Sequence, residues 1–443
     1  MSSYKKSETG RERPPDKIKL TPLAQRDLEA IYLYGLQHFN EESANTYLET
    51  IEHAFTVIRH NKIGIYFMNT ENTNIRASLL SYRNSKLLSD GADKISIIEF
   101  VIYSDSKFTS HILDEKAYSF LNMLPLSVDD IAPSITIRAN WSVDGNKTIF
   151  SGIEPYTTDF HGGWFTDEIA ALISLKLGVR AHAGTVTREY NDRTPEHGFP
   201  RAEQNPPPHF LTKKKSLIVP SCKKSISLEE LKKINNIHHL DESDFNHLIR
   251  AARSFQDSLW ICESSPNLAW LLMVSALETA AQQWDRSKGN SIEKFKQSKP
   301  NLFDKLNNDQ YKELIPIISE EFSSTFGAGR KFRDFCIKFI PDEPKERPEH
   351  GRIKWKKQEL KDIFIKVYEL RSTALHTGQP FPAPMCSTPD NYFGLSEQAV
   401  TGLASSTLGG TWTPKEAPIN LNIFFHMTHS ILNKWWDSLY LPN

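Results

Sequence analysis

Apolar residues recur at helical spacing over most of the second half of the chain. In residues 241–264, DESDFNHLIRAARSFQDSLWICES, six apolar side chains share one helical face: Phe245, Leu248, Ile249, Ala252, Phe255 and Leu259. The next segment, PNLAWLLMVSALETAAQQW, is apolar nearly all round, which is typical of a helix at the centre of a bundle. Further helical patterns cover about 301–322, 328–339, 357–376 and 419–441. The sequence therefore predicts an all-α bundle over residues 228–443.

The first half of the chain mixes strand and helix patterns. Residues 17–64 predict a short strand and two helices, and the β-branched and aromatic run KISIIEFVIY predicts a strand at 94–103. SITIRANW and KTIFSGI predict two more strands, at 134–141 and 147–153. A helix is predicted from a cap at Thr166 to Gly178, with four residues on its apolar face: Ile169, Leu172, Ile173 and Leu177.

A proline-rich break separates the two halves. Residues 191–227 contain six prolines and a lysine triplet at 213–215, a composition that favours a loop or linker over a compact element. We therefore expect an α+β multidomain protein with four parts. They are a disordered lead at 1–16, an α/β unit at 17–108, a mixed β-rich domain at 109–227 that ends in the linker, and the helical domain at 228–443.

Composition narrows the class of protein. The chain has 443 residues, 39% hydrophobic and 24% charged, with a formal net charge of −1, so any RNA site must be a local patch. The four cysteines include no close pair, which argues against a zinc ribbon or a disulfide framework and favours a reducing compartment. The polar start predicts no signal peptide. The most apolar run is interrupted by Glu278 and is too short to span a membrane. These features predict a cytoplasmic protein.

Residues 17–103 resemble the RelE/ParE toxin family. The residues that carry the resemblance are LTPLAQRDLEAIYLYG at 20–35, the pattern from Ala44 to Leu48, and NKIG at 61–64. The segment NIRASLLSYR at 74–83 corresponds to the arginine-bearing strand of that family. The resemblance implies a small α/β toxin, and the family includes ribosome-dependent mRNA endonucleases and gyrase poisons. A structural role or the binding of an antitoxin-like helix is the alternative.

An arginine interrupts the apolar stripe of the helix predicted at 357–376. That stripe is formed by Leu360, Ile363, Phe364, Val367, Leu370 and Ala374. Arg371 lies within the stripe, and a buried guanidinium needs a carboxylate, a phosphate or a water-filled cleft. Glu278 is equally out of place among the apolar residues of the central helix. We therefore predict that Glu278 pairs with Arg371, either as a brace or to aim the guanidinium at a substrate phosphate.

His376 follows Arg371 by five residues. Five residues turn an ideal helix by about 140°, so one straight helix does not direct both side chains at the same atom. Two arrangements bring the two groups together. Either the helix loosens near Gly378, or two copies of the helix face each other across a two-fold axis and share one cleft.

Arg-x-x-x-x-His on the last-but-one helix of a bundle resembles the HEPN superfamily. PNLAWLLMVSALE, VYELRSTALHTG and HGGWFTDEIAALISLKLGVR together resemble the ApeA-like HEPN proteins of bacteria, over about residues 110–443. The resemblance implies a metal-independent endoribonuclease, dimeric through the helical domain, that acts in phage defence or as a toxin. It implies Arg371 and His376 as catalytic residues, with Glu278 and Ser372 beside them, RNA as substrate and no cofactor.

Several alternatives remain open at this stage. In the first alternative, the helical domain is a non-catalytic scaffold or regulator. In the second, the activity resides in the toxin-like part. In the third, the toxin-like part is a sensor that restrains the nuclease until a phage-derived trigger arrives. Gly162 and Gly163 precede the start of a helix, where backbone N–H groups can bind an anion. The two acidic residues in the first turn of that helix oppose an anion site, so close packing of the glycines with Trp164 is the favoured alternative. The triplet at 213–215 is a solvated surface or an RNA contact. His182, His197 and the pair His238–His239 lack the spacing of metal ligands, so we expect no metal site.

Overall fold

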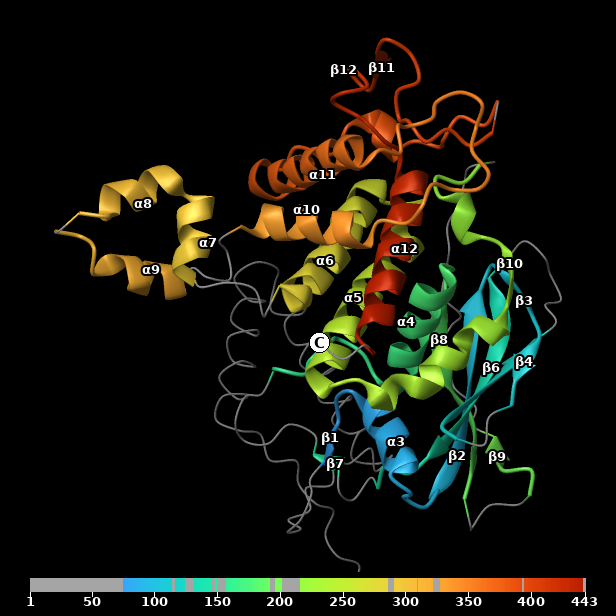
Figure 1. The fold of residues 1–443 in the computed structure, drawn as a ribbon. Helices are drawn as coiled ribbons and strands as arrows, with labels where there is room; N and C mark the ends of the chain where they lie inside the picture. Colours follow the sequence, from blue (N-terminus) through green and yellow to red (C-terminus); the bar gives the residue numbers. More distant parts are fainter. Residues whose placement is uncertain are drawn as a thin grey trace, which may run out of the picture. The chain divides into compact units, whose positions relative to one another are not determined.

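The computed structural model divides the chain into two compact units, residues 1–72 and 73–443. The described residues all belong to the second unit, which is a mixed α+β fold (Figure 1). The lead predicted at 1–16, the helical hairpin predicted at 17–64 and the lysine triplet lie outside them. The described ranges are 75–113, 116–123, 131–144, 148–149, 157–191, 196–200, 216–285, 291–308, 310–321, 327–392 and 394–440.

A six-stranded antiparallel sheet forms one layer of this unit. Its strands lie in the order β4 (His111–Ile112), β5 (Tyr118–Asn122), β6 (Ala132–Trp141), β2 (Ser96–Ser104), β8 (His182–Tyr190) and β9 (Phe199–Pro200). The strands predicted at 94–103 and 134–141 are confirmed as β2 and β6, which pair along their lengths. Because β2 is paired on both sides, the compact unit includes it and begins at 73, whereas the sequence predicted a domain boundary at 108.

The segment expected to form the arginine-bearing strand, residues 74–83, is a strand only at its start and helical only from residue 80. The strand there is β1 (Ile75–Arg76), and it pairs in parallel with β7 (Thr148–Ile149), the described part of the strand predicted at 147–153. The chain then forms α3 (Leu80–Ser89). The Glu168 carboxylate accepts hydrogen bonds from the backbone N–H groups of Leu80 (3.1 Å) and Ser81 (2.7 Å), which satisfies the free donors of the first turn. A carboxylate 87 residues away starts this helix, so no local pattern announces it.

Helix α4 (Phe165–Leu177) joins the sheet to the bundle. It packs against β8 and α5, and Phe165 contacts Phe100 of β2 with ring centroids 5.5 Å apart. The predicted end at Gly178 is confirmed, with the glycine at φ 61°. The predicted cap at Thr166 is wrong. The N-cap is Trp164, whose backbone N–H donates to the Asp167 carboxylate at 2.8 Å.

The C-terminal region is confirmed as helical, but it is not all-α as predicted: it opens with a 3-10 helix at residues 228–239, its α-helices begin at residue 242, and two short paired strands lie within residues 405–412. Its main helices are α5 (Glu242–Ile261), α6 (Pro266–Trp284), α10 (Ala328–Phe339), α11 (Lys357–Thr377) and α12 (Leu421–Ser438). Helix α6 packs against each of the other four, which is the central position predicted for it (Figure 1). Its Trp270 is fully buried between Phe381 and Phe424, with ring centroids at 5.2 and 4.5 Å.

Shorter elements complete the described chain. The helices α7 (Ser291–Ser298), α8 (Pro300–Leu306) and α9 (Leu314–Glu321) share a separate small core of Phe295, Phe303 and Ile315. The remaining elements are β3 (Lys107–Thr109), η2 (Pro220–Cys222), β10 (Ser225–Ser227), η3 (Leu228–His239), η4 (Ala383–Cys386), β11 (Ser405–Thr407) and β12 (Gly410–Trp412). Since β10 pairs with β3 and Val219 is fully buried, residues 216–227 are packed structure, unlike the loop predicted there. In the described part of the chain, no helix has the length and apolar character needed to cross a membrane.

Candidate functional site

The predicted ion pair between the two helices is present. Nη2 of Arg371 on α11 lies 2.6 Å from Oε2 of Glu278 on α6 and donates a hydrogen bond to it. Charge-assisted bonds of this kind orient a guanidinium and leave its other N–H groups available to a second acceptor. The prediction from two misplaced charges in apolar stripes is therefore confirmed as a contact.

The two charges are less buried than their place in the stripes suggests. The side chain of Arg371 is 23% exposed and that of Glu278 is 22% exposed. Toward its start α11 is covered, with Leu360, Phe364 and Val367 buried, whereas Leu375 near its end is 53% exposed. The helix leaves the bundle gradually, so Arg371 lies where the apolar stripe emerges into solvent.

Tyr368, one turn before Arg371, completes the site around Glu278. Its ring centroid is 5.8 Å from the Arg371 guanidinium carbon, and its hydroxyl interacts with the Glu278 carboxylate in a way that lowers the pKa of that carboxyl. Burial raises the pKa of Glu278, and the Arg371 charge and the bonds from Tyr368 and Arg371 oppose that rise. Burial and the Glu278 charge raise the pKa of Tyr368. The three side chains interact electrostatically, and Arg371 and Tyr368 partly offset the cost of burying the Glu278 carboxylate.

Gly329 on α10 makes room for the Tyr368 ring. A Cβ at position 329 would lie 3.0 Å from the nearest ring atom, which is closer than a normal packing contact. Phe332 on the same helix packs against the ring with centroids 5.2 Å apart. The tyrosine is therefore fixed by α10 while it binds the glutamate of α6, so three helices define the position of the Arg371 guanidinium.

Within one chain, Arg371 and His376 lie on one unbroken helix that does not direct both side chains at the same point. Helix α11 continues through Thr377 and ends at Gly378, which has φ 73° and donates its N–H to the Ala374 carbonyl oxygen. Because the helix is intact at 376, the arrangement with a loosened end does not occur here. An ideal helix separates the two positions by about 140° and by about 7.5 Å along its axis. His376 is exposed and Ser372 is half-buried, and among the described residues neither side chain makes a hydrogen bond within the chain.

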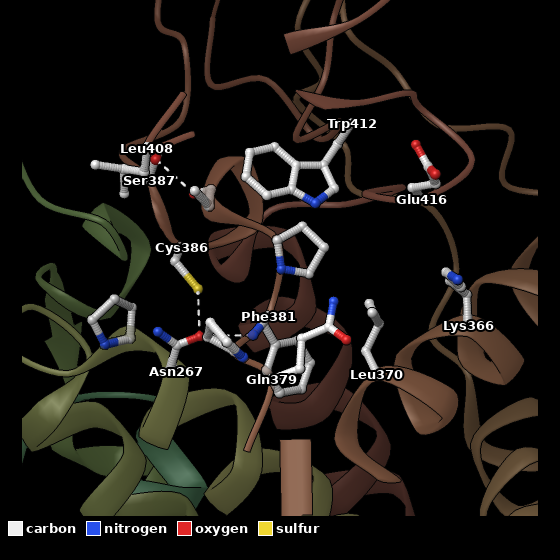
Figure 2. A pocket seen from close by; sticks show the side chains of 14 residues that line it. Asn267, Lys366, Leu370, Gln379, Phe381, Cys386, Ser387, Leu408, Trp412 and Glu416 are labelled. Atoms are coloured by element: carbon white, nitrogen blue, oxygen red, sulfur yellow. Dashed lines mark hydrogen bonds between the residues drawn. The ribbon is translucent and has the colours of Figure 1, made fainter. Parts of the chain in front are cut away.

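A cavity that the sequence did not predict opens beside α11. Its volume is about 610 Å³, and it is lined by Lys366 and Leu370 of α11, by the segment from Gln379 to Ser387, and by residues around β12 (Figure 2). Arg371 and His376 are not among its lining residues. Figure 2 shows the Trp412 indole on the side of the cavity opposite Gln379 and Phe381. The sequence signals that would have pointed here are the Pro-Phe-Pro turn after α11 and a tryptophan after two glycines.

The other candidate positions from the sequence, the glycine pair and the histidines, lie in packed or hydrogen-bonded surroundings. Gly163 lies against the Arg253 guanidinium, which donates to the Gly162 carbonyl oxygen at 3.0 Å, so Gly163 is closely packed, whereas a Cβ at Gly162 would meet no atom within 4 Å and Trp164 is 61% exposed. Nδ1 of His238 lies 3.2 Å from the Ser85 hydroxyl oxygen, and its ring contacts that of His239 with centroids 3.9 Å apart and planes tilted by 46°. The part of the chain that the structure describes contains no group of three or more His, Cys, Asp or Glu side chains placed to hold a metal ion.

A buried ionic cluster lies away from this site and was also not predicted. Arg180, between α4 and β8, is fully buried, and its guanidinium lies 2.6 Å from Asp105 and 3.2 Å from Glu263. Glu263 also accepts from the backbone N–H groups of Ile218 and Val219. The cluster joins the sheet, the end of α5 and the segment before η2, which is a structural role.

Comparisons with known proteins found no match: no family model, no curated protein and no solved structure is similar to this chain. The function proposed below therefore depends on the residues and their geometry, with the HEPN and RelE/ParE resemblances as expectations.

Proposed function

We propose that this chain is a metal-independent endoribonuclease of the HEPN type. Arg371 and His376 carry the chemistry in a cleft between the α11 helices of two copies, in the cytoplasm. The supporting observation is the guanidinium of Arg371, whose side chain is 23% exposed, and which is oriented by Glu278 at 2.6 Å and lies on the same helix as an exposed imidazole. A guanidinium with one edge fixed and another facing solvent is suited to binding a phosphate.

RNA supplies its own nucleophile for this reaction. The 2′-hydroxyl attacks the adjacent phosphorus, the new O2′–P bond forms as the P–O5′ bond breaks, and the products are a 2′,3′-cyclic phosphate and a 5′-hydroxyl. The His376 imidazole takes the 2′-proton or protonates the departing O5′. Arg371 binds the non-bridging oxygens and stabilises the charge that develops on them. Because DNA lacks the 2′-hydroxyl, it is not a substrate.

Glu278 and Ser372 act beside this pair. Glu278 occupies one nitrogen of Arg371, which fixes the rotamer and directs the remaining N–H groups toward the phosphate. Tyr368 holds Glu278 in turn. Ser372, next to Arg371 on α11, turns its hydroxyl about 100° around the helix toward the His376 side and offers a further hydrogen bond to the phosphate.

Two copies are needed for the two groups to meet. The end of α11 bears the 53% exposed Leu375, an apolar contact for a partner helix. A two-fold axis across this end puts Arg371 of each copy opposite His376 of the other. We propose that the resulting homodimer acts in phage defence or as a toxin. The RelE/ParE-like residues 17–103 contribute a toxin or sensor module that responds to an antitoxin or a phage-derived trigger.

Incubation with RNA in EDTA tests the activity. The wild-type chain is expected to cleave RNA and leave 2′,3′-cyclic phosphate ends, while Arg371→Ala and His376→Ala are inactive. Lys357→Ala, at the exposed start of the same helix, is the matched control and retains activity. Cleavage that survives both substitutions, or that requires an added metal ion, contradicts the proposal.

A non-catalytic HEPN scaffold is the second candidate, and one observation favours it. Arg371 is already paired within the chain, and Tyr368 and Gly329 form a fitted setting around the pair. A pair used only as a brace would look the same. In that case the helical domain regulates the fused toxin-like module, and Arg371→Ala lowers stability without removing any cleavage.

A further inference from the structure

We propose that the cavity beside α11 binds a single unstacked nucleobase of the RNA strand, with the Trp412 indole as its stacking surface. This inference rests on the proposed function, since the base belongs to the substrate of Arg371 and His376. It adds a substrate-binding position that neither the sequence motif nor the ion pair indicates.

The cavity has one aromatic side that is free to stack. The Trp412 indole lies across the cavity from Phe381, and Trp412 is only half-buried (Figure 2). Gly410 allows this position, because a side chain there would overlap the indole. Phe381 is 3% exposed and stacks on Trp270 with ring planes 14° apart, so the floor of the cavity is rigid. A flat ring that enters between this floor and the indole gains stacking on a preformed surface.

The polar groups at the cavity suit a base attached to a phosphate. Figure 2 shows the Gln379 amide between the floor and the indole. An amide both donates and accepts, so it bonds to the edge of any base. Lys366 lines the same cavity from α11, where its ammonium makes a long ion pair of 3.9 Å with the Glu369 carboxylate and can also contact a phosphate. Glu416 also lines the cavity, but its carboxylate is held by the N–H and the hydroxyl of Thr413.

The cavity lies close to the proposed reaction centre along the chain. Leu370 precedes Arg371 directly, and Gln379 follows His376 by three residues. Lys366 and Arg371 are separated by about 7.5 Å along the helix axis. A strand whose phosphate is bound by Arg371 therefore has a neighbouring nucleotide within reach of the cavity. The volume of about 610 Å³ exceeds what one base occupies and falls within the range of small-ligand pockets.

A proline-rich peptide is the competing occupant, because Pro266, Pro380 and Pro382 line the cavity together with Trp412. The cavity has one partly exposed aromatic side chain, Trp412, and a cation, Lys366, on the helix that carries the proposed reaction centre, whereas such peptides bind extended grooves lined with several aromatic residues. The geometry therefore favours the base, and a peptide arm in the experiment separates the two.

The test measures binding without cleavage. A fluorescein-labelled 2′-O-methyl oligoadenylate lacks the nucleophile, so its Kd for the full chain in EDTA, measured by fluorescence anisotropy, does not depend on catalysis. Trp412→Ala is expected to raise Kd about tenfold, as loss of one base–aromatic stack does, and Trp412→Phe to raise it far less. Lys366→Ala raises Kd and lowers the salt dependence. Tyr392→Ala, at an aromatic residue that is 82% exposed and outside the cavity, is the matched control and leaves Kd unchanged.

A series of abasic oligonucleotides keeps the test independent of folding. One abasic position is expected to weaken binding to the wild-type chain about tenfold and to have no further effect on Trp412→Ala. Equal Kd values for wild type, Trp412→Ala and every abasic oligonucleotide overturn the base site, even if Arg371 and His376 prove to cleave RNA. Oligoproline that binds through Trp412, with RNA that does not, overturns it as well. Binding that depends on Trp412 in a chain that never cleaves RNA keeps the base site and removes only the nuclease.

Discussion

Nη2 of Arg371 lies 2.6 Å from Oε2 of Glu278, and this contact joins α11 to α6 at the point where α11 emerges from the bundle. The pair is half-buried, so it is neither a surface ion pair of little consequence nor a fully desolvated one. Its position makes the guanidinium rigid on one side and accessible on the other. That combination underlies both the stability predictions and the catalytic proposal.

Glu278 gives stability a specific pH dependence. Burial raises its pKa above the ordinary 4.5, despite the opposing effects of Arg371 and Tyr368. A carboxyl whose folded-state pKa is raised contributes stability below its unfolded pKa and loses that contribution as pH rises through the folded value. Glu278→Gln cannot titrate, so the free energy of unfolding of wild type minus that of the variant is expected to fall between about pH 4 and pH 7.

Urea denaturation of both proteins at the two pH values measures this difference. Arg371→Gln removes a group that lowers the Glu278 pKa, so the same comparison in that background gives a larger fall. A difference that grows with pH would mean that the ion pair outweighs burial.

Gly329→Ala is expected to destabilise the protein through Tyr368. The new methyl group would lie 3.0 Å from the ring, and overpacking of this kind costs about 1–3 kcal/mol. Gly402→Ala is the matched control, because a Cβ there meets no atom within 4 Å. Thermal unfolding of the two variants is the measurement. Equal melting temperatures would show that Tyr368 is free to move away from α10.

Arg180→Met is expected to cost about 3–5 kcal/mol of stability, because it leaves two buried carboxylates without their cation. Arg188→Met, on the neighbouring strand β8, removes an arginine whose side chain is 38% exposed and is expected to cost less than about 1 kcal/mol. Chemical denaturation of both variants gives the comparison. A small loss for Arg180→Met would show that water or side-chain rearrangement satisfies Asp105 and Glu263.

The position of β2 predicts which fragments fold. Residues 73–443 retain the whole six-stranded sheet, whereas residues 109–443 lack β2 from its middle and are expected to be insoluble. Soluble expression and circular dichroism of the two fragments test this.

Growth arrest by residues 1–72 alone, with none from 73–443, would assign the toxicity to the N-terminal unit instead of α11.

The sequence predicted the features that follow from local pattern. Elements with regular periodicity or a defined stop residue were predicted and are confirmed. They are the strands β2 and β6, the helices α5, α6, α10, α11 and α12, and the end of α4 at its glycine. The pairing of Glu278 with Arg371 was predictable because a charge in an apolar stripe requires a partner. Each of these features can be predicted from one segment of the sequence, or from two segments that each carry a charge in an apolar stripe.

Features that depend on distant contacts were not predictable. The first turn of helix α3 fell in the segment compared with a strand, and no local signal marked it because it is capped by Glu168, far along the chain. The Arg180 cluster combines residues from three separated segments, each ordinary in its own context. The cavity beside α11 likewise exists only because the loop carrying Trp412 folds back over Gln379 and Phe381. The exposure of Arg371 was not predictable either, because it depends on how far neighbouring elements cover the end of α11.

Mixing two inactive variants tests the shared cleft most directly. Arg371→Ala and His376→Ala are each expected to be inactive in RNA cleavage. In a mixed dimer, one site receives Arg371 from one copy and His376 from the other, so equal mixing restores about one quarter of wild-type activity. If the mixed dimers form and activity stays absent, or if either variant cleaves RNA alone, the two residues do not act together across a two-fold cleft.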